Sequence, residues 1–148
     1  MHHITPRLSP SIMLVIVALF VALAGALAVC VAPAAHAGVA LNTIDDHATH
    51  ARNGAQLRAS GPIGCTQRER ITIRVGVRQP ATGARARGSW TAACTGEVQH
   101  WQVRARARTE ARFADGTATV CAVAKTRAGQ RVTETRKWCK RVALSARF

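Results

Sequence analysis

Residues 70–78 read RITIRVGVR, and this stretch decides the fold class of the chain. Ile71, Ile73, Val75 and Val77 occupy every second position, with a polar residue or glycine between them. Alternation with a period of two is typical of a β-strand that buries one face and exposes the other. The apolar positions are all β-branched, which also favours a strand. The stretch therefore predicts a half-buried strand with its arginines on the exposed face.

The same alternation recurs further along the chain, in stretches separated by short turn signals. The alternating stretches are 84–92, 101–113, 118–124 and 132–144, and the turn signals are Pro80–Gly83, Thr95-Gly96, Asp115-Gly116 and Ala128-Gly129. No stretch after the first 37 residues shows the period of an amphipathic helix. The sequence therefore predicts an all-β fold, an antiparallel meander of about six to seven strands that forms a small sandwich or a partly open barrel.

Two turn signals predict how neighbouring strands pair. A two-residue turn at Thr95-Gly96 would place Trp90 opposite Trp101, so that apolar residues meet across the hairpin. Asp115-Gly116 predicts a second hairpin. The segment Val98–Phe113 is too long for one straight strand, so we expect it to bend and to pair with different neighbours at its two ends.

Residues 12–32 are an unbroken apolar run that precedes the β region. Arg7 lies ahead of the run, and Ala35-His36-Ala37 follows it. A positive start, an apolar centre and a small-residue cleavage site are the three parts of a secretory signal peptide. We therefore expect residues 1–37 to be a signal peptide with a helical centre, cleaved after Ala37, and the mature protein to be secreted. The run is also long enough to span a bilayer, so an uncleaved anchor is the alternative, and membrane association is expected only in that case.

The remaining chain divides into two parts. Residues 38–54 show no sustained period, which predicts a flexible N-terminal segment or a first edge strand. Residues 55–148 hold the predicted strands and the cysteines that remain after cleavage, Cys65, Cys94, Cys121 and Cys139. An even number of cysteines in a small exported chain predicts disulfides, with three pairings open. A thiolate metal site would need closely spaced C-x-x-C pairs, which are absent, so we expect no metal and no cofactor.

The composition is strongly basic. The 148-residue chain has 21 Lys and Arg residues against 7 Asp and Glu, a formal charge of +14, and all but three of these cations are arginine. Such a composition excludes an acidic tail and a coiled coil, and it predicts attraction to anionic partners. Many arginines fall on the polar sides of the predicted strands. The candidate anion-binding residues are Arg74, Arg85, Arg87, Arg104, Arg106 and Arg108.

The predicted register sets some of these arginines opposite one another, Arg87 against Arg104 and Arg85 against Arg106. Directly opposed like charges destabilise a sheet. A surface that tolerates them would gather an anion such as phosphate, sulfate, teichoic acid or nucleic acid. The alternative is an arginine-biased composition that only supplies polar residues to a wet face. A stacking platform for single-stranded nucleic acid is not expected, because the tryptophans lie on the apolar sides.

One set of spacings resembles a known group of proteins. The pattern C-x-G-x-x-x-x-W at Cys94–Trp101, then F-x-x-G-x-A-x-V at Phe113–Val120, then Cys139 and RVAL, resembles a group of small secreted actinobacterial domains. Those domains are expected to be β-sandwiches, and their function is unknown. The resemblance covers roughly residues 55–145, with motifs that mark turns and core positions. It implies the pairings Cys65–Cys94 and Cys121–Cys139, and it implies no activity.

Three other groups of residues are candidates for chemistry. Asp45-Asp46-His47 together with His50 could bind a divalent metal, or it is a solvated tail. Glu97 and His100 are the side-chain types of small basic ribonucleases, but they would point to opposite faces of a strand. The loop Arg78–Gly83 could present the rigid segment of a small protease inhibitor. No catalytic-triad, zinc-protease or phosphate-loop motif occurs in the chain.

The sequence as a whole predicts a secreted, monomeric binding domain that is not an enzyme. Its expected partner is an anionic polymer or a cell-envelope component, held by the arginine-lined face. The alternative is a protein partner, as for an extracellular interaction module or a protease inhibitor. A cationic ribonuclease or an antimicrobial protein comes third.

Overall fold

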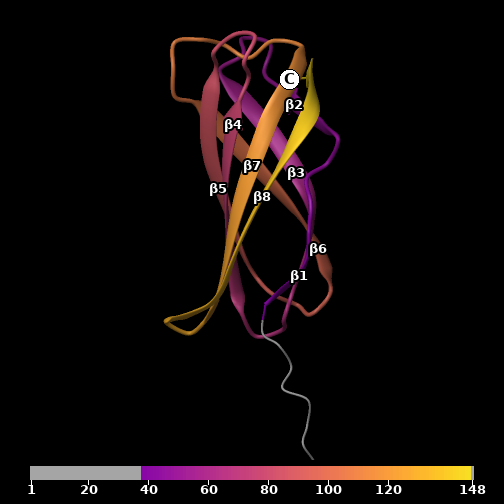
Figure 1. Cartoon of the computed structure of the whole chain (residues 1–148), viewed down its shortest axis with the longest axis vertical. Coiled ribbons are helices and arrows are strands. Elements are labelled where there is room, and N and C mark those ends of the chain that lie inside the picture. The colour runs from indigo at the N-terminus through magenta and orange to yellow at the C-terminus, as the bar shows by residue number, and fades with distance from the viewer. Residues whose placement is uncertain (1–37, 148) are drawn as a thin grey trace, which may run out of the picture. The chain divides into compact units, whose positions relative to one another are not determined.

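The computed structural model describes residues 38–147, which form one sheet of eight strands (Figure 1). The strands are β1 (Val39–Asn42), β2 (His47–His50), β3 (Gln56–Cys65), β4 (Arg70–Arg78), β5 (Arg85–Ala93), β6 (Val98–Ala107), β7 (Gly116–Ala128) and β8 (Arg131–Ala146). The expected signal peptide and its helix lie outside the described residues. Within residues 38–147, no helix is long and apolar enough to cross a membrane.

The sheet closes into a seven-stranded barrel because β3 pairs with β6. The strand order is β3-β2-β8-β7-β4-β5-β6, and β6 returns to β3 in a register that runs from Gln56 opposite Arg106 to Gly64 opposite Val98. The extra strand, β1, pairs with the second half of β3, beyond the residues that β2 covers. The all-β prediction is confirmed. A closed barrel with one extra strand replaces the predicted sandwich or partly open barrel, and closure leaves few unpaired strand edges.

The barrel is not the simple antiparallel meander that the turns predict. β7 lies between β8 and β4, and β2 pairs in parallel with β8. The Asp115-Gly116 hairpin is wrong, since Gly116 begins β7 and β7 has β4 and β8 as its neighbours. A turn signal reports that the chain reverses locally, but it does not say which strands become neighbours. The connection over residues 108–115 instead carries the chain from β6 to the far side of β4.

The predicted register between β5 and β6 is also wrong. These strands pair only at their shared end, where Ala86 faces Ala107 and Arg87 faces Arg106. Trp90 lies opposite Ile73 of β4, and Trp101 lies opposite Gly61 of β3. The expectation for Val98–Phe113 is confirmed in part. The strand ends at Ala107 and pairs with β3 along its length, and a second neighbour, β5, is added only at its end.

Residues 38–54 contain β1 and β2, which corrects the expectation of a flexible segment. Ile44 and Ala48 are buried in the core, and the Lys140 Nζ atom donates a hydrogen bond to the Ile44 carbonyl at 2.9 Å. Each strand has only four residues, so neither is long enough to produce a sustained period in the sequence. The alternative expectation of a first edge strand describes β1, which pairs on one side with β3.

Alternate residues of every long strand point into the barrel and fill it. Ile71, Ile73, Val75 and Val77 of β4 are all buried, as the alternation predicts. Trp101 is fully buried, and the other two tryptophans are half-buried against the same core. Polar residues between these positions point outward, so the alternation that builds the core also builds the outer surface.

Two disulfides connect the strands. Cys65–Cys94 joins the end of β3 to the residue after β5, and these two strands are separated in the sheet by β6. Cys121 and Cys139 are directly opposite each other on β7 and β8, on the outer side of the barrel. Both pairings that the resemblance implied are therefore present.

Removal of the first disulfide should destabilise the barrel more than removal of the second. The bridge Cys65–Cys94 spans 29 residues of chain, whereas Cys121–Cys139 spans 18 within one hairpin. We expect Cys65→Ala/Cys94→Ala to lower the free energy of unfolding by about 3–4 kcal/mol, because the unfolded chain gains loop entropy. Urea unfolding of both double variants measures the difference. A loss below about 1 kcal/mol for the longer loop would contradict this account.

Candidate anion-binding face

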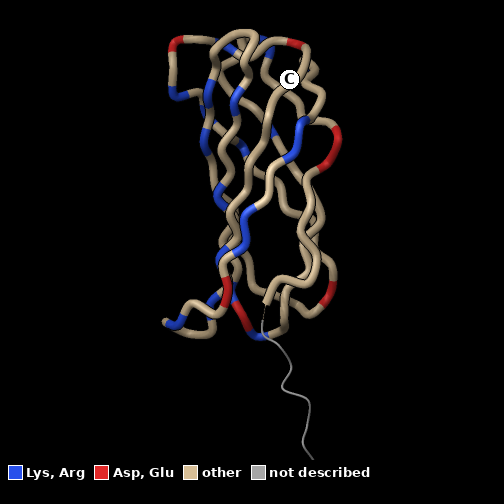
Figure 2. Tube along the Cα trace, viewed as in Figure 1, with Lys and Arg blue, Asp and Glu red and all other residues tan. Residues whose placement is uncertain are grey.

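The outer surface of β5, β4, β7 and β8 is covered by cations, and we call it the basic face. Period-two alternation buries every second residue of these strands and turns the cations outward. Figure 2 shows where the cations lie along the chain. The exposed cations of the basic face are Arg85 and Arg87 on β5, Arg70, Arg74 and Arg78 on β4, Lys125 and Arg127 on β7, and Lys137 and Arg141 on β8.

No acidic residue of the described chain projects from these outward positions. The acidic residues lie in the connections between strands, apart from Glu134 of β8. Glu134 accepts a hydrogen bond from the backbone N–H of Val39, and with Arg136 this bond holds the pKa of the Glu134 carboxyl below its usual range. The Glu134 side chain is therefore committed to the N-terminal strand, and it does not neutralise the basic face.

The cations of the basic face have no ion-pair or hydrogen-bond partner for their side chains among residues 38–147. Some are directly opposed across neighbouring strands, as Arg78 is to Arg85 and Arg70 is to Arg127. Opposed like charges repel each other, and water and salt only reduce the repulsion. The face therefore carries a positive potential that an anion would lower.

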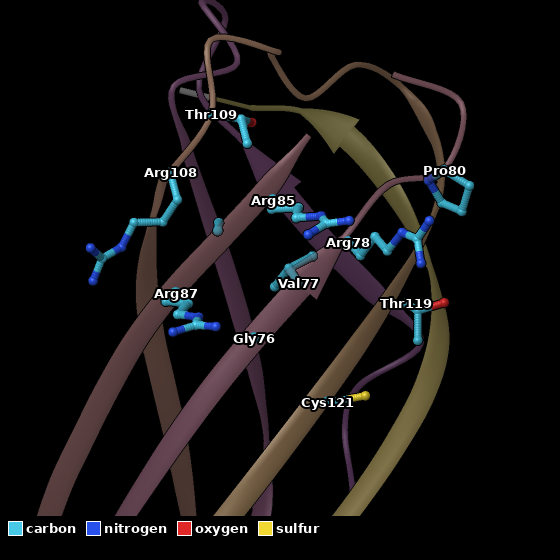
Figure 3. Close-up of a pocket in the computed structure, with 11 residues that line it drawn as sticks. Gly76, Val77, Arg78, Pro80, Arg85, Arg87, Arg108, Thr109, Thr119 and Cys121 are labelled. Carbon is cyan, nitrogen blue, oxygen red and sulfur yellow. The ribbon is translucent and has the colours of Figure 1, made fainter. Parts of the chain in front are cut away.

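An open hollow of about 880 Å³ lies at one end of the basic face, and we call it the Gly76 hollow (Figure 3). Gly76 is the fourth of the five outward residues of β4, between Arg87 of β5 and Cys121 of β7. The side chains around it belong to Arg78, Pro80, Arg85, Arg87, Arg108, Thr109 and Thr119. In Figure 3 the Arg85 side chain runs toward Arg78, and the Arg87 side chain lies beside Gly76. The Arg108 side chain points away from Arg85 and Arg87.

The structure brings together most of the predicted anion-binding residues. Arg74, Arg85 and Arg87 belong to the basic face. Arg108 adjoins it, because the Arg108 N–H donates to the Arg85 carbonyl at 2.8 Å, and Arg108 also lines the Gly76 hollow. Arg106 lies at the border, opposite Arg87.

Arg104 is placed apart from the others. Its partner across the sheet is Arg58 of β3, so it does not face Arg87 as the sequence predicted. The sequence reasoning missed Arg70, Lys125, Arg127, Lys137 and Arg141. These residues also occupy alternate polar positions, but only the order β4-β7-β8 shows that they continue the same face.

Three of the other candidate residues contact side chains elsewhere in the barrel, namely Asp45, Asp46 and His100. Asp46 pairs with Lys140 at 2.7 Å, and Asp45 accepts a hydrogen bond from Ser60 at 2.6 Å. His100 lies 3.3 Å from Asp45. Among the described residues, no group of three or more side chains is placed to hold a metal ion.

The loop considered for protease inhibition is a compact turn rather than an extended segment. Gln79 is buried at the start of this turn, and its backbone N–H donates to the Ala84 carbonyl at 3.0 Å. The Gln79 side-chain amide donates to the Ala114 carbonyl at 2.8 Å and accepts from the Ala114 N–H at 3.0 Å. The turn is thereby packed against the connection between β6 and β7.

His50 links β2 to that same connection. Its Nδ1 atom lies 2.9 Å from the Ala51 carbonyl, and its Nε2 atom lies 3.0 Å from Asp115 Oδ1. The same carboxylate oxygen accepts the Ala146 N–H at 2.8 Å. The hydrogen bond from His50, followed by that from the Ala146 backbone, holds the pKa of Asp115 below its ordinary value of 3.8.

This contact predicts a specific loss of stability in acid. A carboxyl whose pKa is depressed by folding stabilises the folded state above its ordinary pKa, and this contribution disappears as the pH falls through the folded value. We expect Asp115→Asn to lower the melting temperature at pH 7. The difference in melting temperature between the variant and the unmodified protein should shrink below about pH 3.8. Thermal unfolding from pH 7 to pH 2 measures this. Curves that stay parallel over the whole range would contradict the contribution of Asp115.

Comparison with known proteins does not assign the chain to a family. No protein-family model matches it, and a search of curated proteins finds no match. Of the resemblance noted in the sequence, the structure supports a small all-β domain with two disulfides. The disulfides are also compatible with an extracellular location.

Proposed function

We propose that this protein is a secreted binding domain whose basic face holds an anionic polymer or another anionic component of the cell envelope. The observation that carries the proposal is the uniform sign of the face. Its outward positions carry no acidic residue, and its cations have no partner among residues 38–147. Such a face gains free energy from a polyanion chiefly by the release of counterions.

The extent of the face favours a polymer over a single small ion. Outward residues repeat about every 7 Å along each strand, and neighbouring strands lie about 4.8 Å apart. The cations occupy four adjacent strands, so a chain of negative charges could contact several of them at once. Arginine dominates the set, and its planar guanidinium can bind phosphate, sulfate or carboxylate groups through two hydrogen bonds.

The remaining parts of the proposal follow from the sequence. Export through the N-terminal segment, with cleavage after Ala37, would deliver the domain to the place where such polymers lie. We propose a monomer with no catalytic step of its own. The arginine side chains are suited to binding anions. The histidines His50 and His100 are paired with the carboxylates of Asp115 and Asp45.

The salt dependence of binding tests this proposal. The triple variant Arg74→Gln/Lys125→Gln/Arg127→Gln removes three cations that line one shallow depression between β4 and β7. For single-stranded RNA, each lost phosphate contact reduces the slope of log affinity against log salt by about 0.7, so we expect the slope to fall by about 2. Fluorescence titrations at rising salt would measure it, with teichoic acid and heparin as parallel probes.

The matched control removes the same charge from elsewhere. Arg52→Gln/Arg104→Gln/Arg147→Gln changes three exposed arginines that lie outside the basic face. We expect this control to keep the salt slope of the unmodified protein. Equal slopes for both triple variants, or no binding of any polyanion at low salt, would overturn the proposal.

A further inference from the structure

Gly76 is an outward position of β4 without a side chain, and it lines the Gly76 hollow. It pairs with Arg87 on one side and with Cys121 on the other, near the end of β4. Its φ is not among the positive values, so the backbone at this position does not require glycine. A Cβ atom added to Gly76 would meet nothing within 4 Å. Neither backbone conformation nor packing therefore explains the glycine.

A glycine inside a strand weakens the strand, and it often marks a place where a ligand comes close to the backbone. At Gly76 the effect is local, since the flanking outward residues Arg74 and Arg78 have long side chains. Because Gly76 has no side chain, the backbone of β4 is accessible at the floor of the hollow. Arginine side chains line the hollow.

The charges around the hollow favour a doubly charged anion. Arg78 and Arg85 are directly opposed across β4 and β5, and Arg87 is the cross-strand partner of Gly76 itself. These three side chains have no acidic or hydrogen-bonding partner among the described residues. A monoanion would compensate one guanidinium, whereas a dianion between Arg78 and Arg85 would compensate both.

We infer that the Gly76 hollow is a subsite for a tetrahedral dianionic group, of which a phosphate monoester is the chemical type. The inference rests on the proposed function, and it names the group that the basic face prefers. The oxygens of the group would lie over Gly76 and accept hydrogen bonds from Arg78, Arg85 and Arg87. The hydroxyls of Thr109 and Thr119 are at the rim, where they could donate further bonds. The group could be the end of a bound polymer or a free small phosphate.

A pair of oligothymidylates that differ at one end tests the subsite. Both have the same length, but one ends in a 5′-phosphate monoester and the other in a 5′-hydroxyl. At pH 7.5 and moderate salt we expect the phosphorylated chain to bind about tenfold more tightly, as two charge-assisted hydrogen bonds would provide. At pH 5 the ratio should fall toward one, because the second pKa of a phosphate monoester is about 6 while arginine stays charged.

Two variants locate the effect. Gly76→Val covers the backbone of β4 at the floor of the hollow without changing any charge. It should fold, because its Cβ meets no atom and a β-branched residue suits a strand. Arg85→Gln removes one of the opposed guanidinium groups. Both should reduce the ratio between the two oligonucleotides to about one. Their controls are Ser89→Val and Arg74→Gln, which lie on the same outer surface but do not line the hollow, and these should keep the ratio.

The outcomes separate this inference from the proposed function. If both oligonucleotides bind equally to the unmodified protein, the inference is overturned and polymer binding stands. If neither binds, polymer binding fails, and a titration with phenyl phosphate followed by NMR decides the inference. Shifts around Gly76 that disappear in Gly76→Val would then support a site for a free phosphate. Shifts that persist in Gly76→Val, or no shifts at all, would overturn the site.

Discussion

The pairing of β3 with β6 is the contact on which the rest of the structure depends. It joins the two ends of a seven-stranded sheet, and so it gives every strand one face toward a common interior and one toward solvent. The interior is filled largely by alanine, valine and isoleucine around Trp101, residues small enough for a narrow barrel. Such a modest core buries limited apolar surface, which explains the presence of two disulfides in a domain of this size.

Closure also explains how the barrel tolerates its charge. The outer face of a closed sheet need not pack against anything, so each cation of the basic face remains hydrated. Repulsion between exposed charges is weak in water and is screened over about 8–10 Å at ordinary ionic strength. The cystine Cys121–Cys139 lies within the same outer face and links β7 to β8. The barrel thus carries a surface whose charges lower the stability of the folded state and would attract an anionic partner.

Gly76 and Glu69 show two different departures from the ordinary arrangement of a β-strand. Gly76 leaves an opening on the outside, beside arginines without partners. Glu69 is buried at the start of β4, and its carboxylate oxygens have no hydrogen-bond partner among the described residues. Of these two residues, only Gly76 adjoins a charged surface that a ligand could reach. A buried acidic group without a hydrogen-bond partner costs stability.

The sequence by itself determined the strand character of β4, β5, β7, β8 and most of β6, and which face of these strands is buried. Period-two alternation around Ile71–Val77 reports both, because it depends only on neighbours in the chain. The sequence also indicated that the cysteines form disulfides, and that arginines such as Arg74, Arg85 and Arg87 lie on the outer side.

Only the tertiary structure decided which strands are neighbours. β7 lies between β4 and β8, and this position places Lys125 on the basic face. β6 pairs with β3, so Arg104 lies outside that face. β1 and β2 were also decided at this level, since four residues are too few to show a period. Strand partners depend on closing the barrel and burying one shared core. These contacts join residues far apart in sequence, so no local sequence pattern predicts them.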